Sequence, residues 1–448
     1  MQSRKGEPLQ FSDETPQPST LDQALVRARR RLMPFLLLMY IIAFLDRSNI
    51  AFARNALEAN LGISAHTYAL AAGLFFISYG VLEIPSNLML HKVGAKRWLA
   101  RIMVTWGLIS TATLFVHGSR SFYFARLMLG AAEAGFFPGV ILYLTYWFPH
   151  RVRGQVLGIF YFGAPLALSI GGPVSTWLLH MRFSGGLRNW QWMFLLEGLV
   201  AVGVGVWSFW YLDNGPSEAS WLSADEKQAL LHALAREKDS DSFHRPSEIM
   251  PMLRDWRVLH YTLLYFLIQI GVYGVVFYLP SEISSMFPHS GVWTIGIAAA
   301  IPWVCAFFAA LAIPRLADRR RTHRALAAIT LLLAGLAGFL LASAGPYIGF
   351  IALCIAASGF FAAQPIFWTF PSNYLTDRAA AAGLALINAV GNLGGFFAPN
   401  LRAWADSAFA SQRAGLFLLA AISVLAALVT VAIRKPRATL APVSPVQS

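Results

Sequence analysis

The sequence has few charged residues for its length. Only 13% of its 448 residues are Asp, Glu, Lys or Arg, whereas a soluble domain carries roughly 25%. Soluble enzymes, nucleic-acid-binding proteins and disordered proteins all need more charge than this. The shortage therefore argues against these three classes before any motif is considered.

Cysteines and the common catalytic motifs are also scarce. The two cysteines, Cys305 and Cys354, lie in apolar segments and cannot form a disulfide framework. The sequence has no GxxxxGKS or GxxxxGKT, HExxH, GxSxG or CxxC motif, and its 10 histidines form no cluster with metal-ligand spacing. We therefore expect neither an ATP-driven pump nor an enzyme, and we expect no metal and no cofactor.

What the sequence has instead is long apolar runs. Hydrophobic residues make up 57% of the chain, and its mean hydropathy is +0.55. A membrane-spanning helix needs about 20 apolar residues, and a lone strand in lipid would leave its backbone groups unpaired. We predict an all-α integral membrane protein with twelve transmembrane helices. The predicted spans are 32–53, 67–90, 97–117, 121–147, 153–179, 190–212, 258–281, 291–314, 323–344, 346–370, 378–401 and 413–434.

The basic residues indicate how these spans are oriented. When residues 1–31 are placed inside, most of the 35 lysines and arginines fall in loops on the same side. This distribution follows the positive-inside rule, so we expect a multi-pass protein of the plasma (inner) membrane with both termini in the cytoplasm. The net charge of +13 belongs to these loops and does not indicate a nucleic-acid partner.

The loops divide the chain into five parts. We predict a cytoplasmic N-terminal tail (1–31), a six-helix half (32–212), a cytoplasmic linker (213–257), a second six-helix half (258–434) and a cytoplasmic tail (435–448). Residues 223–236 of the linker have helical spacing. Basic loops at 91–101 and 314–324 occupy corresponding positions in the two halves. Such a duplication is typical of transporters with a binding site near the middle of the membrane.

Four of the charged residues inside the predicted spans can meet at one depth: Asp46 and Arg47 in the first span, and Arg126 and Glu133 in the fourth. At 1.5 Å per residue, the first pair lies roughly 21 Å from the inner end of its span and Glu133 roughly 18 Å from the outer end. These depths are near a common level in a layer about 30 Å thick. Seven residues separate Arg126 from Glu133, so the two share a helix face. We predict a transport site, and the alternative is structural ion pairing.

The chemistry of these four residues suggests separate roles. Arginine presents a permanently charged donor fork that suits a carboxylate, so Arg47 and Arg126 are candidate substrate-binding residues. A desolvated carboxyl group favours its neutral form, so Asp46 and Glu133 are candidate proton-coupling residues. An anion that neutralises the arginine charge favours protonation of the neighbouring acid. This is a physical route from anion binding to proton uptake.

The other polar residues of the spans are weaker candidates. For Glu83 we expect an interfacial or gating contact, and we interpret Glu197 as structural. The remaining predicted substrate-binding residues are Tyr79, Tyr273, Gln364, Trp368, Asn388 and Asn392. Their neutral donors suit hydroxyl or carbonyl groups, and the aromatic members suit an aromatic acid, whereas interhelical hydrogen bonding is the alternative. Gly391 and Gly395 indicate close helix packing.

Several segments resemble one family of transporters. The segments are AFLDRSNIAFA (43–53), PSNLMLHKVGAKRWLARIMVTWG (85–107), ARLMLGAAEAGFFPGVILYLTYWFP (125–149) and AAAAGLALINAVGNLGGFFAP (379–399). They are similar to segments of the anion:cation symporter family within the major facilitator superfamily. The resemblance covers nearly all of 32–434. One departure is APN at 398–400, where a glycine–proline pattern is commoner.

The resemblance implies the major facilitator fold and proton-coupled uptake of a small organic anion such as tartrate, phthalate, hydroxyphenylacetate or a sugar acid. It also implies that Asp46 and Glu133 act in proton coupling, and that Arg47 and Arg126 bind the substrate carboxylate. We therefore predict a secondary active transporter that works by alternating access, as a monomer in the lipid bilayer. The alternatives are transport of a neutral or cationic solute on the same fold, an efflux antiporter, and a membrane sensor that does not transport.

Overall fold

The computed structural model describes residues 19–181, 186–238, 254–375 and 377–433. These residues form helices and connecting turns, with no strand among them. Twelve helical segments of the described chain are long and apolar enough to cross a membrane, as the sequence predicted. The predicted tail at 435–448, residues 1–18 of the N-terminal tail and residues 239–253 of the linker lie outside the described residues.

The first six spans comprise eight α-helices because two of the spans are interrupted. The helices are α1 (Thr20–Leu61), α2 (Ala65–Val93), α3 (Ala95–Ala112) with the short η1 (Thr113–Phe115), α4 (Ser119–Glu133), α5 (Phe136–Thr145), α6 (His150–Tyr161), α7 (Gly163–His180) and α8 (Asn189–Tyr211). The fourth span is α4 with α5, and the fifth is α6 with α7.

The linker and the second six spans follow the same plan. The linker contains η2 (Pro216–Glu218) and α9 (Ala224–Lys238), so the short helix predicted there is confirmed. The spans are α11 (Trp256–Met286), α12 (Val292–Arg320), α13 (His323–Ser343), α14 (Pro346–Tyr374), α15 (Asp377–Asn392) with α16 (Gly394–Ala408), and α17 (Ala414–Val431). The predicted span 291–314 is part of one continuous helix, α12, although it contains Pro302.

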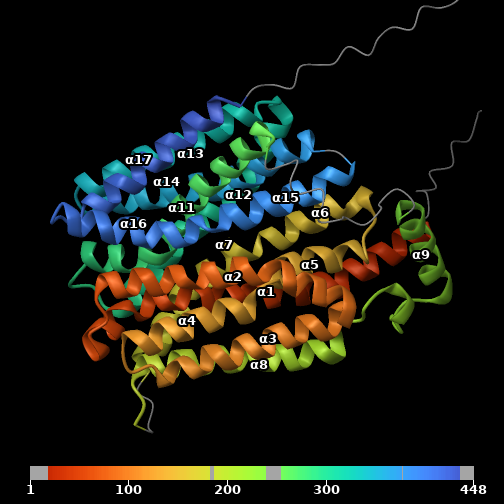
Figure 1. Ribbon diagram of the computed structural model, residues 1–448, viewed down its shortest axis with the longest axis horizontal. Helices are drawn as coiled ribbons and strands as arrows, with labels where there is room; N and C mark the ends of the chain where they lie inside the picture. The colour runs from red at the N-terminus through yellow and green to blue at the C-terminus, as the bar shows by residue number, and fades with distance from the viewer. Residues whose placement is uncertain (1–18, 182–185, 239–253, 376, 434–448) are drawn as a thin grey trace, which may run out of the picture.

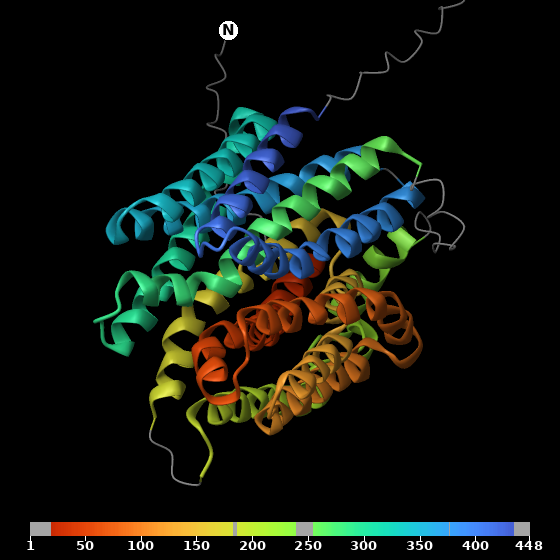
Figure 2. The same ribbon diagram turned by 60° about the vertical axis from the view of Figure 1, so that its left-hand side comes forward.

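The spans form two bundles that lie side by side (Figures 1 and 2). Helices α1 to α8 form the N-terminal half, and α11 to α17 form the C-terminal half. One end of the molecule carries α9 and the turn from α2 to α3, and we call it the linker face. The other end carries the turn from α1 to α2, and we call it the opposite face. A cavity between the halves holds the candidate site described below.

Helix α1 begins at Thr20, inside the segment predicted to be a tail, because polar contacts extend the helix beyond its apolar part. Ser19 caps it by accepting a hydrogen bond from the backbone N–H of Asp22 at 3.2 Å. Arg27 then pairs with Glu226 of α9 at 2.9 Å. The Arg31 guanidinium lies over the ring of Tyr211, 4.7 Å from its centre. These contacts attach the linker helix to the N-terminal half.

The break in the fourth span lies directly after Glu133. Gly135 has a φ of +84°, a left-handed conformation that disfavours residues with a Cβ. A Cβ on Gly135 would also collide with the Ser86 side chain of α2. Glycine at this position therefore lets α4 end at Glu133 and brings the chain close to α2.

Glycines also bring helices together around the break between α15 and α16. A Cβ on Gly391 would collide with the Tyr265 ring of α11, and one on Gly395 would collide with the Phe76 ring of α2. The close packing predicted for these two glycines is therefore confirmed. The second contact joins the two halves, since α2 and α16 belong to different bundles.

The two halves contact each other closely on the side of the opposite face. Arg54 of α1 donates to the Ser281 hydroxyl of α11 at 3.3 Å. Asn400, in the APN segment, donates to the Ala69 carbonyl of α2, also at 3.3 Å. A Cβ on Gly172 of α7 would lie 2.8 Å from the Gly296 carbonyl oxygen of α12. These contacts close the interface between the halves on this side.

Candidate functional site

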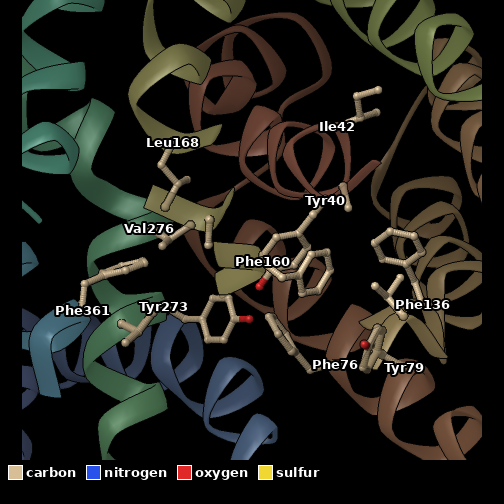
Figure 3. Packing of buried hydrophobic residues seen from close by; sticks show 14 of the residues in the cluster. Tyr40, Ile42, Phe76, Tyr79, Phe136, Phe160, Leu168, Tyr273, Val276 and Phe361 are labelled. Atoms are coloured by element: carbon tan, nitrogen blue, oxygen red, sulfur yellow. The ribbon is translucent and has the colours of Figure 1, made fainter. Parts of the chain in front are cut away.

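A cavity lies between the two halves and takes its lining from both. It encloses about 90 Å³, room for several water molecules or a small solute. Its polar lining residues are Tyr40, Arg47, Tyr79, Glu133, Tyr161, Tyr265, Gln269, Tyr273, Gln364, Asn388 and Asn392. Figure 3 shows Tyr273 of α11 reaching towards Phe76 of α2, and their ring centres are 4.4 Å apart. Seven of the ten residues predicted to bind substrate or protons line this cavity: Arg47, Glu133 and the five neutral residues Tyr79, Tyr273, Gln364, Asn388 and Asn392.

Arg47 and Glu133 form an ion pair at the wall of this cavity. The Nη2 atom of Arg47 contacts Oε1 of Glu133, and its Nη1 atom donates to the Tyr273 hydroxyl at 3.1 Å. The Arg47 side chain is 11% exposed and the Glu133 side chain 1%. Oε2 of Glu133 has no hydrogen-bond partner among the described residues. Arg47 thus links the proposed proton acceptor of the first half to a tyrosine of the second.

Arg126 lies behind this pair and does not line the cavity. Its guanidinium and that of Arg47 each lie 5.1 Å from the ring centre of Phe75. Both cations therefore contact the fully buried Phe75 ring. Nε and Nη2 of Arg126 have no hydrogen-bond partner among the described residues. Arg126 is a buried cation with free donors, and it lies outside the cavity lining.

Asp46 also lies behind the cavity rather than in its lining. Its Oδ1 atom accepts hydrogen bonds from the Ser110 hydroxyl and, at 3.2 Å, from Asn49. Asn49 also donates to Glu197 of α8 at 2.9 Å. Asp46 interacts electrostatically with Arg126 and Glu133. The four charges predicted to meet are therefore neighbours, but only Arg47 and Glu133 reach the cavity.

The neutral polar residues of the C-terminal half are placed individually. Gln269 donates to the Asn392 side chain at 2.9 Å, and both line the cavity, as Gln364 does. Trp368 does not line it and packs instead on Tyr265, with ring centres 4.9 Å apart. The sequence left two alternatives for such residues, hydrogen bonding between helices and contact with a solute. Asn392 shows that a hydrogen bond between helices does not prevent a side chain from lining the cavity.

Glu83 contacts the other half at the edge of the cavity. Asn388 of α15 donates to its carboxylate at 3.1 Å, and Glu83 is only 5% exposed. The bond joins the two halves on the linker-face side of Tyr79, and the role of Glu83 in gating stays a prediction. The bond also gives Asn388 a partner that lies in the other half.

Sequence reasoning missed the aromatic part of the lining. Tyr40, Phe136, Tyr161 and Tyr265 all face the cavity, and Tyr40 stacks on Phe160 with ring centres 4.4 Å apart. The sequence carries 14% aromatic residues, so an aromatic residue in a span is a weak signal. Its helix face, rather than its identity, decides whether it meets lipid or the cavity.

The fold and the site define a membrane transporter rather than an enzyme. Twelve helices in two six-helix halves surround a central cavity that contains a buried ion pair. A family model described as Major Facilitator Superfamily matches residues 36–399, and the chain belongs to this superfamily. Within it, the chain is similar to the anion:cation symporter group that its segments resemble.

Two relatives support this assignment, and a solved structure shows the same fold. The chain is 43% identical to the inner membrane transport protein RhmT of Escherichia coli (strain K12), over 93% of this chain and 96% of that protein. It is 40% identical to a putative tartrate transporter of Agrobacterium vitis, over 90% and 93%. The crystal structure of a bacterial homologue of the human lysosomal transporter Spinster, inward-facing and unoccupied, has a TM-score of 0.72 and 16% identity, over 90% of this chain and 96% of that one.

Proposed function

We propose that the protein takes up a small organic anion together with protons across the inner membrane. The observation that carries this proposal is the ion pair between Arg47 and Glu133 at the cavity wall. Arg47 is a permanently charged donor fork that suits a carboxylate. In this pair the Glu133 carboxylate occupies the position that a substrate carboxylate would take.

Exchange of one carboxylate for the other couples the anion to a proton. A substrate carboxylate that binds Arg47 displaces Glu133, which then has no cation at its side chain. An unpaired carboxylate in a buried site is strongly disfavoured, and protonation removes the charge. Glu133 therefore binds a proton when the anion binds and releases it when the anion leaves. The same reasoning argues against a cationic substrate, which Arg47 would repel.

Arg126 and the neutral lining complete the proposed substrate site. Arg126 holds two donor nitrogens without partners behind Phe75, so it is a second anchor for the anion once that ring turns. Tyr79, Tyr273, Gln364, Asn388 and Asn392 offer hydroxyl and amide groups to the rest of the molecule. Such groups suit a hydroxylated acid, and a putative tartrate transporter is among the relatives. Trp368 is a supporting residue, since it packs on Tyr265.

We further propose that the linker face lies in the cytoplasm. Its loops carry most of the lysines and arginines. With this orientation, both termini are cytoplasmic, and the interface between the halves is closed on the outer side by contacts such as Arg54 with Ser281. Rocking of the two halves about the cavity then gives alternating access.

The test is uptake into proteoliposomes under an imposed inward proton gradient. The probes are radiolabelled tartrate, a sugar acid, phthalate and hydroxyphenylacetate, each with and without a protonophore. We expect accumulation of one acid that collapses with the protonophore. If no acid moves, or if movement ignores the proton gradient, the proposal is overturned.

A further inference from the structure

A second group of carboxyls lies behind the cavity, where Asp46 and Glu197 share one amide. The side-chain nitrogen of Asn49 donates to Oδ1 of Asp46 at 3.2 Å and to Oε2 of Glu197 at 2.9 Å. Asn49 is 0% exposed, Asp46 1% and Glu197 8%. Two acids from different helices, α1 and α8, therefore meet at one buried nitrogen.

The surroundings of this group contain few charges that could compensate two carboxylates. Ser110 of α3 donates to Asp46, and Ser175 of α7 donates to Glu197 at 2.9 Å. Asp46 has Arg126 and Glu133 of α4 as charged neighbours. The charged neighbour of Glu197 is Asp46 itself, and no described cation pairs with it. Hydroxyl groups alone face Glu197 from α7, and an amide faces it from α1.

Two ionised carboxylates at one amide in a dry site repel each other strongly. One proton removes this repulsion. The amide is suited to such a mixed pair, because its NH2 group donates to a carboxylate and its oxygen accepts from a carboxylic acid. In the structure, the amide oxygen of Asn49 and Oδ2 of Asp46 have no partner among the described residues. The proton would bind to Oδ2 of Asp46, and the amide oxygen of Asn49 would accept a hydrogen bond from the protonated carboxyl group.

We propose that Asp46 and Glu197 form a joint binding site for one proton, distinct from the Arg47–Glu133 pair. One carboxyl carries the proton while the other is a carboxylate, and the Asn49 amide turns to match. The only species bound or released is the proton. Glu197 lies about 12 Å from the start of α8 at the opposite face, so the site lies on that side of the charged cluster. The participation of this proton in transport rests on the proposed function, but its presence does not.

The first experiment needs no substrate. Purified protein in liposomes is taken from acid to alkaline pH, and infrared difference spectra measure the C=O band of protonated carboxyl groups. The variants are Glu197→Gln, Asp46→Asn and the double variant, with Glu58→Gln as a control because Glu58 is an exposed acid on the same α1. Each single variant leaves one acid that is no longer repelled by a second carboxylate, so this acid releases its proton at a lower pH than the pair does. We expect the carboxyl signal that the wild type keeps at the highest pH to be missing from each single variant and from the double variant.

This lack of additivity is the decisive result, because a proton that belongs to the pair disappears once only. Unchanged signal in a folded Glu197→Gln protein would overturn the proposal, and so would two separate losses that add in the double variant. Asn49→Leu keeps both acids and removes the bridge. We expect it to move the pH at which the band titrates, and an unmoved titration would contradict the shared site.

The second experiment counts protons per transported anion with a pH-sensitive dye in proteoliposomes, for whichever of the four acids the wild type accumulates. We expect Glu197→Gln to release fewer protons per anion than wild type and Glu58→Gln to match wild type. An unchanged ratio would overturn the role of this proton in transport. If no acid is transported by the wild type, the proposed function fails, and the infrared result still decides whether the site exists.

Discussion

At the scale of single residues, neighbours in sequence serve different parts of the site. Asp46 and Arg47 are adjacent, and successive residues of a helix point roughly 100° apart. Arg47 consequently faces the cavity, whereas Asp46 faces Ser110, Asn49 and the helices behind. This division gives one helix turn two environments, the cavity on the side of Arg47 and a buried polar network on the side of Asp46.

Arg126→Ala tests whether a cation outside the cavity lining still binds the anion. We expect affinity for the transported acid to fall roughly 10- to 100-fold, because hydrogen bonds to charged groups contribute about 1.5–3 kcal/mol. Binding is measured by isothermal titration calorimetry. Arg120→Ala is the matched control, an exposed arginine on the same α4. Wild-type affinity in Arg126→Ala would restrict the anion site to Arg47.

Glu133→Gln separates anion binding from proton coupling. Glutamine keeps the size of the side chain but holds no exchangeable charge, so the anion no longer has to displace a carboxylate from Arg47. We expect this variant to exchange labelled for unlabelled acid across the membrane, yet to fail to accumulate it under a proton gradient. Both are measured in proteoliposomes. Gradient-driven accumulation at the wild-type level would refute the coupling role of Glu133.

The charged members of the site were predictable from the sequence, and most of their partners were not. Asp46, Arg47, Arg126 and Glu133 stand out because charge is costly inside an apolar span. Phe75, whose ring contacts both arginines, is one of 33 phenylalanines and carries no such signal. Glu197 was visible as a buried acid, but its link to Asp46 depends on how α1 and α8 are rotated against each other.

At the scale of helices, the apolar runs predicted where the spans lie but not where they break. The fourth predicted span, 121–147, is interrupted after Glu133 by a glycine in a left-handed conformation. Hydropathy does not reveal this break because the span as a whole, Ser119–Thr145, is apolar enough to cross a membrane. Helix α1 begins before the predicted span because its first turns are helical but polar, and hydropathy detects only apolar segments.

Gly135→Ala tests whether the break after Glu133 needs glycine. A left-handed conformation costs a residue with a Cβ roughly 1–2 kcal/mol, and the new methyl group would also overlap Ser86. We expect a lower midpoint of thermal unfolding in detergent, followed by tryptophan fluorescence, and slower transport. Ser86→Ala in the same chain removes the overlap with Oγ and keeps the overlap with Cβ, so we expect it to restore only part of the stability.

Gly154→Ala is the matched control for this substitution. A Cβ on Gly154 of α6 meets nothing within 4 Å, and alanine has the higher helix propensity by about 1 kcal/mol. We expect this control to unfold at or above the wild-type temperature. Equal stability of Gly135→Ala and Gly154→Ala would mean that the chain can form the break without a glycine.

At the scale of the whole molecule, the two halves are held together on one side of the cavity. Toward the opposite face, Tyr68 donates to the Phe277 carbonyl at 3.3 Å and Asn400 to the Ala69 carbonyl. Toward the linker face, the described link is the bond from Asn388 to Glu83. The twelve-span layout and the two halves were predictable from hydropathy and the repeated loops. Which side is closed was not, because it depends on contacts between residues far apart in sequence.

Gly172→Leu tests whether close approach of α7 and α12 keeps the opposite face closed. Its side chain would be forced against the Gly296 backbone, and separation of the halves on this side relieves that overlap. The reporter is Ala69→Cys in a Cys305→Ala/Cys354→Ala background, because Ala69 is fully buried beneath Asn400. We expect roughly 10-fold faster maleimide labelling in detergent, which corresponds to about 1.4 kcal/mol in the opening equilibrium.

Gly203→Leu is the matched control, because a Cβ on Gly203 meets nothing within 4 Å. We expect this control to label at the same rate as the reporter alone. Equal labelling rates in Gly172→Leu and Gly203→Leu would exclude the contact between α7 and α12 as the closure.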